Sequence, residues 1–226
     1  MRERMMPQVL AFDVYGTLID TQGVVTKLRG FVGDKAEEFS RIWRDKQLEY
    51  SFRRGLMRSY ETFGVCTSQA LDYTSDYLDV GLSKDQKTAL LDEYRRLPAF
   101  DDVKASLAGL KADGNSLFAF SNGTADAVDT LLVAVGIRDL FDGVVSVDDR
   151  QTFKPSPDVY EHLLNSTAVS ADDAWLISSN PFDVIGAISF GMRSAWVKRS
   201  SQSIFDPWGI EPTLTITSLE ELGRLL

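Results

Sequence analysis

The chain has 226 residues, of which 44% are hydrophobic and 25% are charged. This composition is typical of a globular protein and excludes disordered, collagenous and coiled-coil chains, so we expect one packed unit with room for a modest insertion. The formal net charge of −9 disfavours binding to nucleic acid or to an anionic membrane. The single cysteine, Cys66, excludes an internal disulfide, and the single histidine, His162, excludes a metal held by two imidazoles.

No stretch of the chain approaches the roughly eighteen apolar residues that a membrane span needs. The first apolar run, which begins at Val9, is soon interrupted by Asp13 and Gly16, so we expect neither a signal peptide nor a membrane segment. A chain with one cysteine also suits a reducing compartment. These features predict a cytoplasmic protein.

The first predicted element is a buried strand over residues 9–12, which ends at Asp13 and a glycine turn. Similar apolar runs follow at residues 116–120, 143–146, 174–178 and 194–197. Helical patterns lie near residues 101–113, 124–136, 156–167 and 182–191. This alternation of strands and helices predicts an α/β fold with a doubly wound parallel sheet, similar to a Rossmann core.

The stretch from about residue 20 to residue 97 breaks this alternation, because it contains helical patterns and no convincing strand. The helical segments fall near residues 23–31, 35–53, 57–79 and 84–96. We therefore predict a core of residues 1–19 and 98–226 and a helical cap of residues 20–97, inserted directly after the first strand. The active site should lie between the cap and the carboxyl edge of the sheet.

Polar residues that could do chemistry follow several of the predicted strands. Asp13 follows the first strand, Ser121 follows the second, and Asp183 lies in a loop after a later strand. Lys154 precedes a proline and the next helix. Each could have a purely structural role, since loop acids cap helices and lysines lie on surfaces. In a doubly wound sheet, however, all these positions converge at one edge, which favours a shared active site.

The same residues carry a resemblance to a known superfamily. Residues 12–18 (Phe-Asp-Val-Tyr-Gly-Thr-Leu), 121–123 (Ser-Asn-Gly), Lys154 with Pro155, and the loop from Ser178 to Asp183 occur in the order of the haloacid dehalogenase superfamily. Each motif alone is weak, but together with a cap in the right place they are specific. The resemblance covers essentially the whole chain and implies that Asp13 is a nucleophile.

Most members of this superfamily resemble phosphatases, which carry a second aspartate two residues after the nucleophile as a general acid. Here that position is Tyr15, and the later loop offers Ser178, Ser179 and Asn180 ahead of the single acid Asp183. Displacement of a halide needs no general acid, because halide is a weak base, and a metal would only mask the nucleophile. We therefore expect no metal and no cofactor.

The predicted cap contains a segment, residues 42–50 (Ile-Trp-Arg-Asp-Lys-Gln-Leu-Glu-Tyr), that closely resembles a cap segment of the L-2-haloacid dehalogenase subfamily. Within it, Arg44 and Leu48 share one helical face and pair a guanidinium with an apolar contact. An isolated arginine on a helix is usually a solvated surface charge. Because the remaining motifs also resemble this subfamily, the chain is identified as similar to L-2-haloacid dehalogenases.

This resemblance implies a role for each matched residue. Asp13 would attack carbon 2 of a short L-2-haloacid with inversion and form an aspartyl ester, and Arg44 would receive the departing halide with help from Asn122. The residues implied to orient and polarise Asp13 are Thr17, Lys154, Tyr160 and Ser178. Lys154 would keep Asp13 ionised through its opposite charge.

Further residues are implied in substrate binding and in hydrolysis of the ester. Asn180 and Asp183 would position and deprotonate the attacking water. The groups implied to hold the substrate carboxylate are Ser121 and the backbone amides of Val14 and Tyr15. The apolar pocket around the alkyl group would consist of Leu48, Phe63 and Phe182. Phe182 stands where family members often have tryptophan, a departure that bears on the size of the pocket.

Two other functions stay open at this point. The first is a phosphatase of the same superfamily, in which Asp13 would form an aspartyl phosphate. The second is a catalytically silent relative that binds a metabolite or a partner. The joint retention of Asp13, Arg44, Lys154 and Asp183 favours the dehalogenase, whose substrate is a small anionic haloacid and whose products are a 2-hydroxy acid and halide. The subfamily resemblance also implies a homodimer.

Overall fold

The computed structural model describes residues 8–226, so residues 1–7 of the predicted core range lie outside the described residues. At its centre is a six-stranded sheet of order β3-β2-β1-β4-β5-β6, in which every neighbouring pair is parallel. The strands are β1 (Val9–Asp13), β2 (Ser116–Ser121), β3 (Gly143–Ser146), β4 (Ala174–Ser178), β5 (Arg193–Val197) and β6 (Leu214–Ile216). The predicted α/β fold with a parallel sheet is confirmed.

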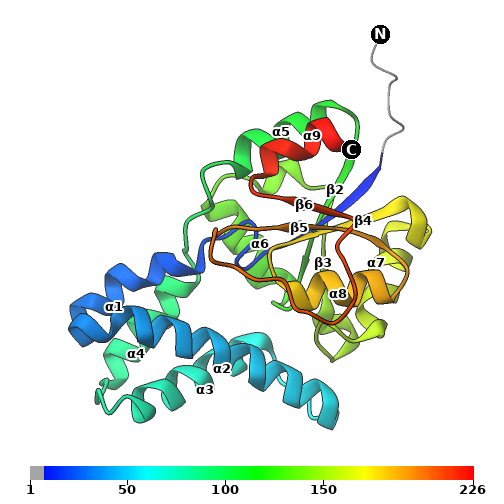
Figure 1. Ribbon diagram of the computed structural model, residues 1–226. Helices are drawn as coiled ribbons and strands as arrows, with labels where there is room; N and C mark the ends of the chain where they lie inside the picture. Colours follow the sequence, from blue (N-terminus) through cyan, green and yellow to red (C-terminus); the bar gives the residue numbers. More distant parts are fainter. Residues whose placement is uncertain (1–7) are drawn as a thin grey trace.

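Helices cover both faces of this sheet because the side chains of each strand alternate between its faces. Leu10 and Phe12 of β1 belong to one buried cluster, and Ala11 between them belongs to the other. The first cluster contains residues of α5 (Val103–Ala112), α6 (Ala125–Ala134) and α9 (Leu222–Leu225). The second contains residues of α7 (Pro157–Thr167) and α8 (Pro181–Ser189). Figure 1 shows the two helical layers on either side of the strands.

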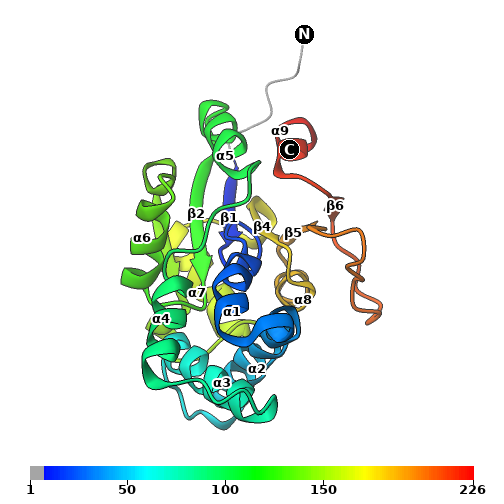
Figure 2. The same cartoon turned by 90° about the vertical axis from the view of Figure 1, so that its left-hand side faces the viewer.

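The region between β1 and α5 is helical and lies beyond the carboxyl ends of the strands (Figure 2). Its helices are α1 (Val25–Val32), α2 (Ala36–Met57), α3 (Phe63–Tyr77) and α4 (Lys84–Tyr94). Several of their buried side chains, such as Leu28, Trp43 and Leu90, are in the same cluster as Phe12 of β1, so this region packs directly on the core. The loop after β1, which follows the predicted nucleophile Asp13, therefore faces the helical region.

Short 3-10 segments connect several of these elements. They are Thr21–Val24, Gly33–Lys35, Arg138–Leu140, Val147–Arg150, Ala171–Asp173 and Leu219–Glu221. None of the helices among residues 8–226 is long and apolar enough to cross a membrane.

Two boundaries of the predicted helices are wrong, namely the end of the helix predicted over residues 35–53 and the start of the next helix. The helix predicted over residues 57–79 begins only at Phe63, because α2 continues to Met57 and Arg58 ends it in the left-handed region at a φ of 53°. Thr62 then caps the new helix by accepting a hydrogen bond from the Val65 amide. The prediction also lacked β6, a three-residue edge strand, and the short α9 that follows it.

Candidate active site

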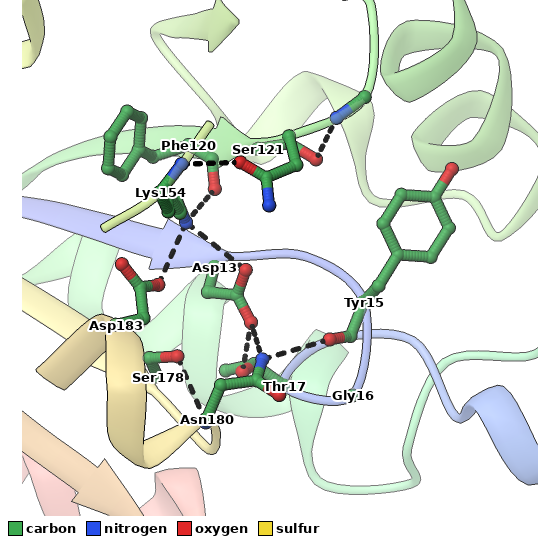
Figure 3. Close-up of polar contacts among 12 residues, drawn as sticks. Asp13, Tyr15, Gly16, Thr17, Phe120, Ser121, Lys154, Ser178, Asn180 and Asp183 are labelled. Atoms are coloured by element: carbon green, nitrogen blue, oxygen red, sulfur yellow. Dashed lines mark hydrogen bonds and ion pairs between the residues drawn. The ribbon is translucent and has the colours of Figure 1, made fainter. Parts of the chain in front are cut away.

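Asp13 is the last residue of β1, and its carboxylate accepts hydrogen bonds from three side chains (Figure 3). The Thr17 hydroxyl and the Asn180 amide each donate to Oδ2 at 2.7 Å. Lys154 Nζ donates to Oδ1 at 3.2 Å. These donors come from the turn after β1, the loop before α7 and the loop after β4, so the parallel sheet brings them together. They fix the orientation of a carboxylate that is 7% exposed.

Lys154 is buried and its ammonium lies between two carboxylates. Besides Asp13, Nζ donates to Asp183 Oδ2 at 2.8 Å and to the Phe120 carbonyl at 2.8 Å. It also lies 4.1 Å from the centre of the Phe120 ring. Two carboxylates and one ammonium leave one negative charge in excess. An anion that approaches Asp13 would therefore need a further cation.

Asp183 is fully buried in the first turn of α8. The Tyr160 hydroxyl donates to its Oδ1 at 2.9 Å, while Lys154 occupies Oδ2. Burial raises the pKa of Asp183, against the lowering effect of Lys154. Burial and the negative charge of Asp183 also raise the pKa of Tyr160 well above its usual value, so Tyr160 remains a donor. Gly186, one turn after Asp183, permits this packing, because an added Cβ would overlap the side chains of Tyr160 and Pro155.

Three of the residues predicted to act on Asp13 or on the water make contacts other than the predicted ones. Two of them, Ser178 and Asn180, lie in the loop after β4, and the third is Tyr160. Ser178 Oγ accepts a hydrogen bond from the backbone N–H of Asn180 at 3.1 Å, so its contact is with the loop and not with Asp13. Asn180 contacts Asp13 directly, although the prediction placed it beside the water, and also donates to the Tyr15 carbonyl at 3.2 Å. Tyr160 similarly reaches Asp13 only through Asp183 and Lys154.

Ser121 and Asn122 lie at the carboxyl end of β2 and are both buried. Ser121 Oγ accepts a hydrogen bond from the Gly123 amide at 3.0 Å, which leaves its hydroxyl proton as a donor for a ligand. Asn122 Oδ1 accepts from the Lys154 amide at 3.0 Å and thereby fixes the loop that carries Lys154. Its amino group supplies the donor that the predicted halide contact would use.

The turn after Asp13 is closed by backbone hydrogen bonds, and the Tyr15 side chain in it packs against the helical region. The Val14 carbonyl accepts hydrogen bonds from the amides of Thr17, Leu18 and Ile19, which closes the turn. The Tyr15 ring packs against Tyr94 and Phe63, with ring centres 5.8 and 5.9 Å apart, and points away from Asp13 (Figure 3). The position that phosphatases use for a general acid therefore holds a packed aromatic ring.

Arg44 brings a cation from α2 to this turn. Its Nη2 donates to the Tyr15 carbonyl at 3.3 Å, and its Nη1 donates to Gln47 Oε1 at 2.6 Å. Gln47 is buried and is itself held by Thr67, whose hydroxyl lies 2.5 Å from Nε2, and by the Tyr94 hydroxyl at 3.1 Å. The guanidinium is thus placed beside the turn that follows Asp13 by hydrogen bonds among side chains of the helical region.

The three predicted pocket residues lie on different elements. Leu48 is half-buried on α2, Phe63 is buried at the start of α3, and Phe182 is half-buried at the start of α8, against the ring of Phe52 at 5.1 Å. A cavity of about 470 Å³ between the helical region and the core includes Tyr15, Phe63 and Thr124 in its walls. A second cavity, of about 730 Å³, includes Lys154 and Phe182.

Comparisons with known proteins show which family this chain is similar to. A family model described as haloacid dehalogenase-like hydrolase matches residues 7–191. The chain is 36% identical to the (S)-2-haloacid dehalogenase of Pseudomonas sp. (strain YL) over 96% of this chain and 93% of that protein. It belongs to the haloacid dehalogenase-like hydrolases.

Several of the relatives are named (S)-2-haloacid dehalogenase or L-2-haloacid dehalogenase. The (S)-2-haloacid dehalogenase of Xanthobacter autotrophicus is 38% identical over 87% of this chain and 77% of that protein. The solved structure of L-2-haloacid dehalogenase from that organism has a TM-score of 0.91 and 32% identity over 97% of this chain and 98% of that one. A further structure of that enzyme has chloropropionic acid covalently bound, at 31% identity and a TM-score of 0.91. The predicted resemblance to L-2-haloacid dehalogenases is confirmed.

Three residues of this haloacid dehalogenase-like hydrolase support the site but were not predicted. Gln47 fixes Arg44, as described above. The Ser179 amide donates to Thr17 Oγ1 at 2.8 Å, and its hydroxyl donates to the Gly16 carbonyl at 2.7 Å. Arg199 follows the end of β5 and donates to the Thr17 carbonyl from Nε at 3.1 Å and from Nη2 at 2.7 Å, so it holds the turn that follows Asp13. Gln47 and Ser179 lie inside the matched motifs, whereas Arg199 lies outside them.

Proposed function

We propose that the protein hydrolyses short L-2-haloacids to 2-hydroxy acids and halide through an ester on Asp13. The observation that carries this proposal is the single carboxylate of Asp13, held by Thr17, Lys154 and Asn180 with the Arg44 guanidinium at the adjacent turn. The names of the relatives and the covalently bound chloropropionic acid in one of their structures support it.

In the first step, a carboxylate oxygen of Asp13 would attack carbon 2 from the side opposite the halogen. A carbon–oxygen bond forms, the carbon–halogen bond breaks, and the halide leaves with the bonding electron pair. Arg44 and the Asn122 amino group stabilise the charge that develops on the halide. Ser121 and the amides of Val14 and Tyr15 hold the substrate carboxylate. Thr17, Lys154 and Asn180 keep Asp13 oriented and ionised.

In the second step, water attacks the ester carbonyl carbon of Asp13, the bond from this carbon to the substrate oxygen breaks, and the 2-hydroxy acid leaves with the proton that Asp183 first takes from the water. Asp183 takes a proton from this water, because a carboxylate with a raised pKa is a stronger base than an ordinary one. Tyr160 and Lys154 orient Asp183, while Ser178 fixes the loop that carries Asn180. The alkyl group of the substrate lies among Leu48, Phe63 and Phe182.

We also propose a domain organisation, a cellular location and an oligomeric state for this protein. Residues 20–97 act as a cap over a core of residues 1–19 and 98–226, and the site lies between them. The enzyme works in the cytoplasm as a homodimer. Size-exclusion chromatography with light scattering checks the oligomeric state, and a monomer at micromolar concentration would contradict it.

The direct test is halide release from (S)-2-chloropropionate in the presence of a chelator. We expect stoichiometric halide and 2-hydroxy acid. A single turnover in oxygen-18 water should leave the hydroxy acid unlabelled and place the label in Asp13, because water attacks the ester carbonyl. Label in the hydroxy acid after that first turnover would contradict the ester mechanism. Absence of halide release, together with magnesium-dependent hydrolysis of a phosphate ester, would replace the proposal by a phosphatase.

A further inference from the structure

Arg199 follows the end of β5, and its guanidinium contacts two segments that are distant in sequence. Besides its two hydrogen bonds to the Thr17 carbonyl, it donates from Nη1 to Asp102 Oδ2 at 2.6 Å. The guanidinium carbon also lies 4.3 Å from the centre of the Phe100 ring. The side chains of Arg199 and Asp102 are each only 13% exposed, so solvent screens this ion pair only in part. A planar guanidinium spans these two acceptors, which a single ammonium could not reach together.

The two segments that Arg199 contacts are those that join the core to the helical region. The chain leaves the core through residues 14–20, after β1, and returns through residues 97–102, before α5. An antiparallel bridge and two backbone hydrogen bonds, of 2.8 and 3.0 Å, join the two segments. Arg199 binds the first segment at Thr17 and the second at Asp102, so it ties this junction to the end of β5.

Thr17 links this junction to the proposed nucleophile. It is fully buried, and its hydroxyl donates to Asp13 Oδ2 at 2.7 Å. Because Arg199 holds the carbonyl of the same residue, a shift of that carbonyl would also move the hydroxyl. The Tyr15 carbonyl, in the same turn, accepts the hydrogen bond from Arg44 of α2. The contact of Arg199 thus bears on the placement of both groups to which the proposed function assigns ester formation.

Asp102 holds the guanidinium in place from the other side. Its Oδ2 also accepts hydrogen bonds from the Ser218 hydroxyl at 3.0 Å and from the Leu219 amide at 2.8 Å. Burial raises the pKa of Asp102, but the hydrogen bonds from Arg199 and Leu219 outweigh this effect and bring the pKa below its ordinary value. Asp102 therefore stays ionised and orients the guanidinium toward Thr17.

We propose that Arg199 is a positioning residue for the reaction. Paired with Asp102, it fixes the Thr17 carbonyl and thereby the orientation of the Asp13 carboxylate, which it contacts only through Thr17. This inference rests on the proposed dehalogenase function. Loss of the contact should slow ester formation, because a small misplacement of reacting groups can cost about a hundredfold in rate.

The first experiment measures ester formation from (S)-2-chloropropionate in a single turnover at saturating substrate, per mole of folded protein. Arg199→Lys keeps the positive charge beside Asp102 but has one nitrogen for two acceptors, so the rate should fall by about tenfold. Arg193→Lys, at the exposed start of the same strand, is the matched control and should stay within about twofold of wild type. A rate within about twofold of wild type in Arg199→Lys, or a rise in KM with the saturating rate unchanged, would overturn the inference while the proposed function stands. If the wild type releases no halide, the proposed function fails and the inference fails with it.

The second experiment separates positioning from support of the fold with a double-mutant cycle. Asp102→Asn keeps an acceptor for Ser218 and Leu219 but removes the charge that orients Arg199, so the rate of ester formation should fall by about threefold. The double variant with Arg199→Lys should be no slower than Arg199→Lys alone, because the two residues act as one unit. Urea denaturation gives the free energy of unfolding of each variant. A double variant whose loss of rate is the product of the two single losses, or losses of rate that disappear when only folded protein is counted, would show that the pair supports the fold and does not position Asp13.

Discussion

The two sides of the candidate site differ in how firmly they hold their groups. On the core side, Thr17, Lys154 and Asn180 contact Asp13 within 3.2 Å, and they come from segments that the parallel sheet fixes in place. On the helical side, Arg44 contacts the core through the Tyr15 carbonyl at 3.3 Å and otherwise depends on Gln47. The core therefore holds the Asp13 carboxylate through three direct contacts, whereas Arg44 on the helical side has a single hydrogen bond to the core residues that the structure describes.

This difference predicts that the largest loss of activity follows substitution of Asp13, the proposed nucleophile on the core side. Asp13→Asn should abolish turnover, because an amide oxygen is a far poorer nucleophile than a carboxylate. Halide release measured in a single turnover checks this, and Asp20→Asn, in the same loop but outside the cluster, serves as a control. Residual first-turnover activity above about 1% of wild type would show that another group attacks carbon 2, since two orders of magnitude correspond to about 2.7 kcal/mol.

Lys154→Met should cause both the next largest loss of activity and a loss of stability. It removes the cation between two buried carboxylates, and breaking a buried pair typically costs about 3–5 kcal/mol. Urea denaturation measures the free energy of unfolding, and halide release should fall by more than about a hundredfold. Lys104→Met, on the exposed face of α5, is the matched control. Equal stability of the two variants would show that the core side does not depend on this ammonium.

Arg44→Lys tests the helical side of the comparison. Lysine keeps the charge but loses the planar fork that contacts both Tyr15 and Gln47, so kcat should fall by about a hundredfold, or about 3 kcal/mol. Stability should change little, because Arg44 is only half-buried. Steady-state kinetics distinguishes a role of Arg44 in stabilising the developing halide from a role in binding the substrate. A rise in KM with kcat unchanged would make Arg44 an anchor for the substrate carboxylate.

The pH dependence of ester hydrolysis tests the base on the core side. Because burial raises the pKa of Asp183, its carboxylate loses the ability to accept a proton as the pH falls through a value above the ordinary 3.9. Below that value the rate should fall by about tenfold per pH unit. The hydrogen bond from Tyr160 lowers the pKa of Asp183, so Tyr160→Phe should move this limb to higher pH. A limb that moves to lower pH in single-turnover measurements would assign the base to another group.

The difference between the core side and the helical side also explains which elements the sequence predicts correctly. Continuous apolar runs mark β1, β2 and β4 because both faces of these strands are buried, and the polar residues at their ends therefore indicate the position of the site. The strand β6 shows no such run, since it has three residues at the edge of the sheet. The break between α2 and α3 carries no glycine or proline signal, because it occurs at Arg58.

Within the site, the sequence predicts the residues of the motifs better than their individual contacts. Thr17 and Lys154 contact Asp13 as predicted, but Ser178 and Tyr160 act through their neighbours. The contact of Gln47 with Tyr94 spans 47 positions, so a role for Gln47 depends on how α2 and α4 pack and not on local spacing. The carboxyl ends of parallel strands provide a rule for the core side, and no comparable rule relates one helix of the other side to the next.

Gln47→Leu should produce the smallest effect and the one most specific to the helical side. It removes the acceptor that holds Arg44 Nη1 at 2.6 Å, and loss of one such hydrogen bond is worth about 1 kcal/mol, or about a fivefold fall in the rate of ester formation. Tyr94→Phe removes the other donor to Gln47 but leaves the contact with Arg44, so it should stay within about twofold of wild type. Rapid-quench measurements separate ester formation from ester hydrolysis, and only the first should slow in Gln47→Leu, because the proposed role of Arg44 is to stabilise the departing halide. An equal fall in both steps, or the same loss in Tyr94→Phe, would mean that Gln47 supports the fold of the helices and does not position the guanidinium.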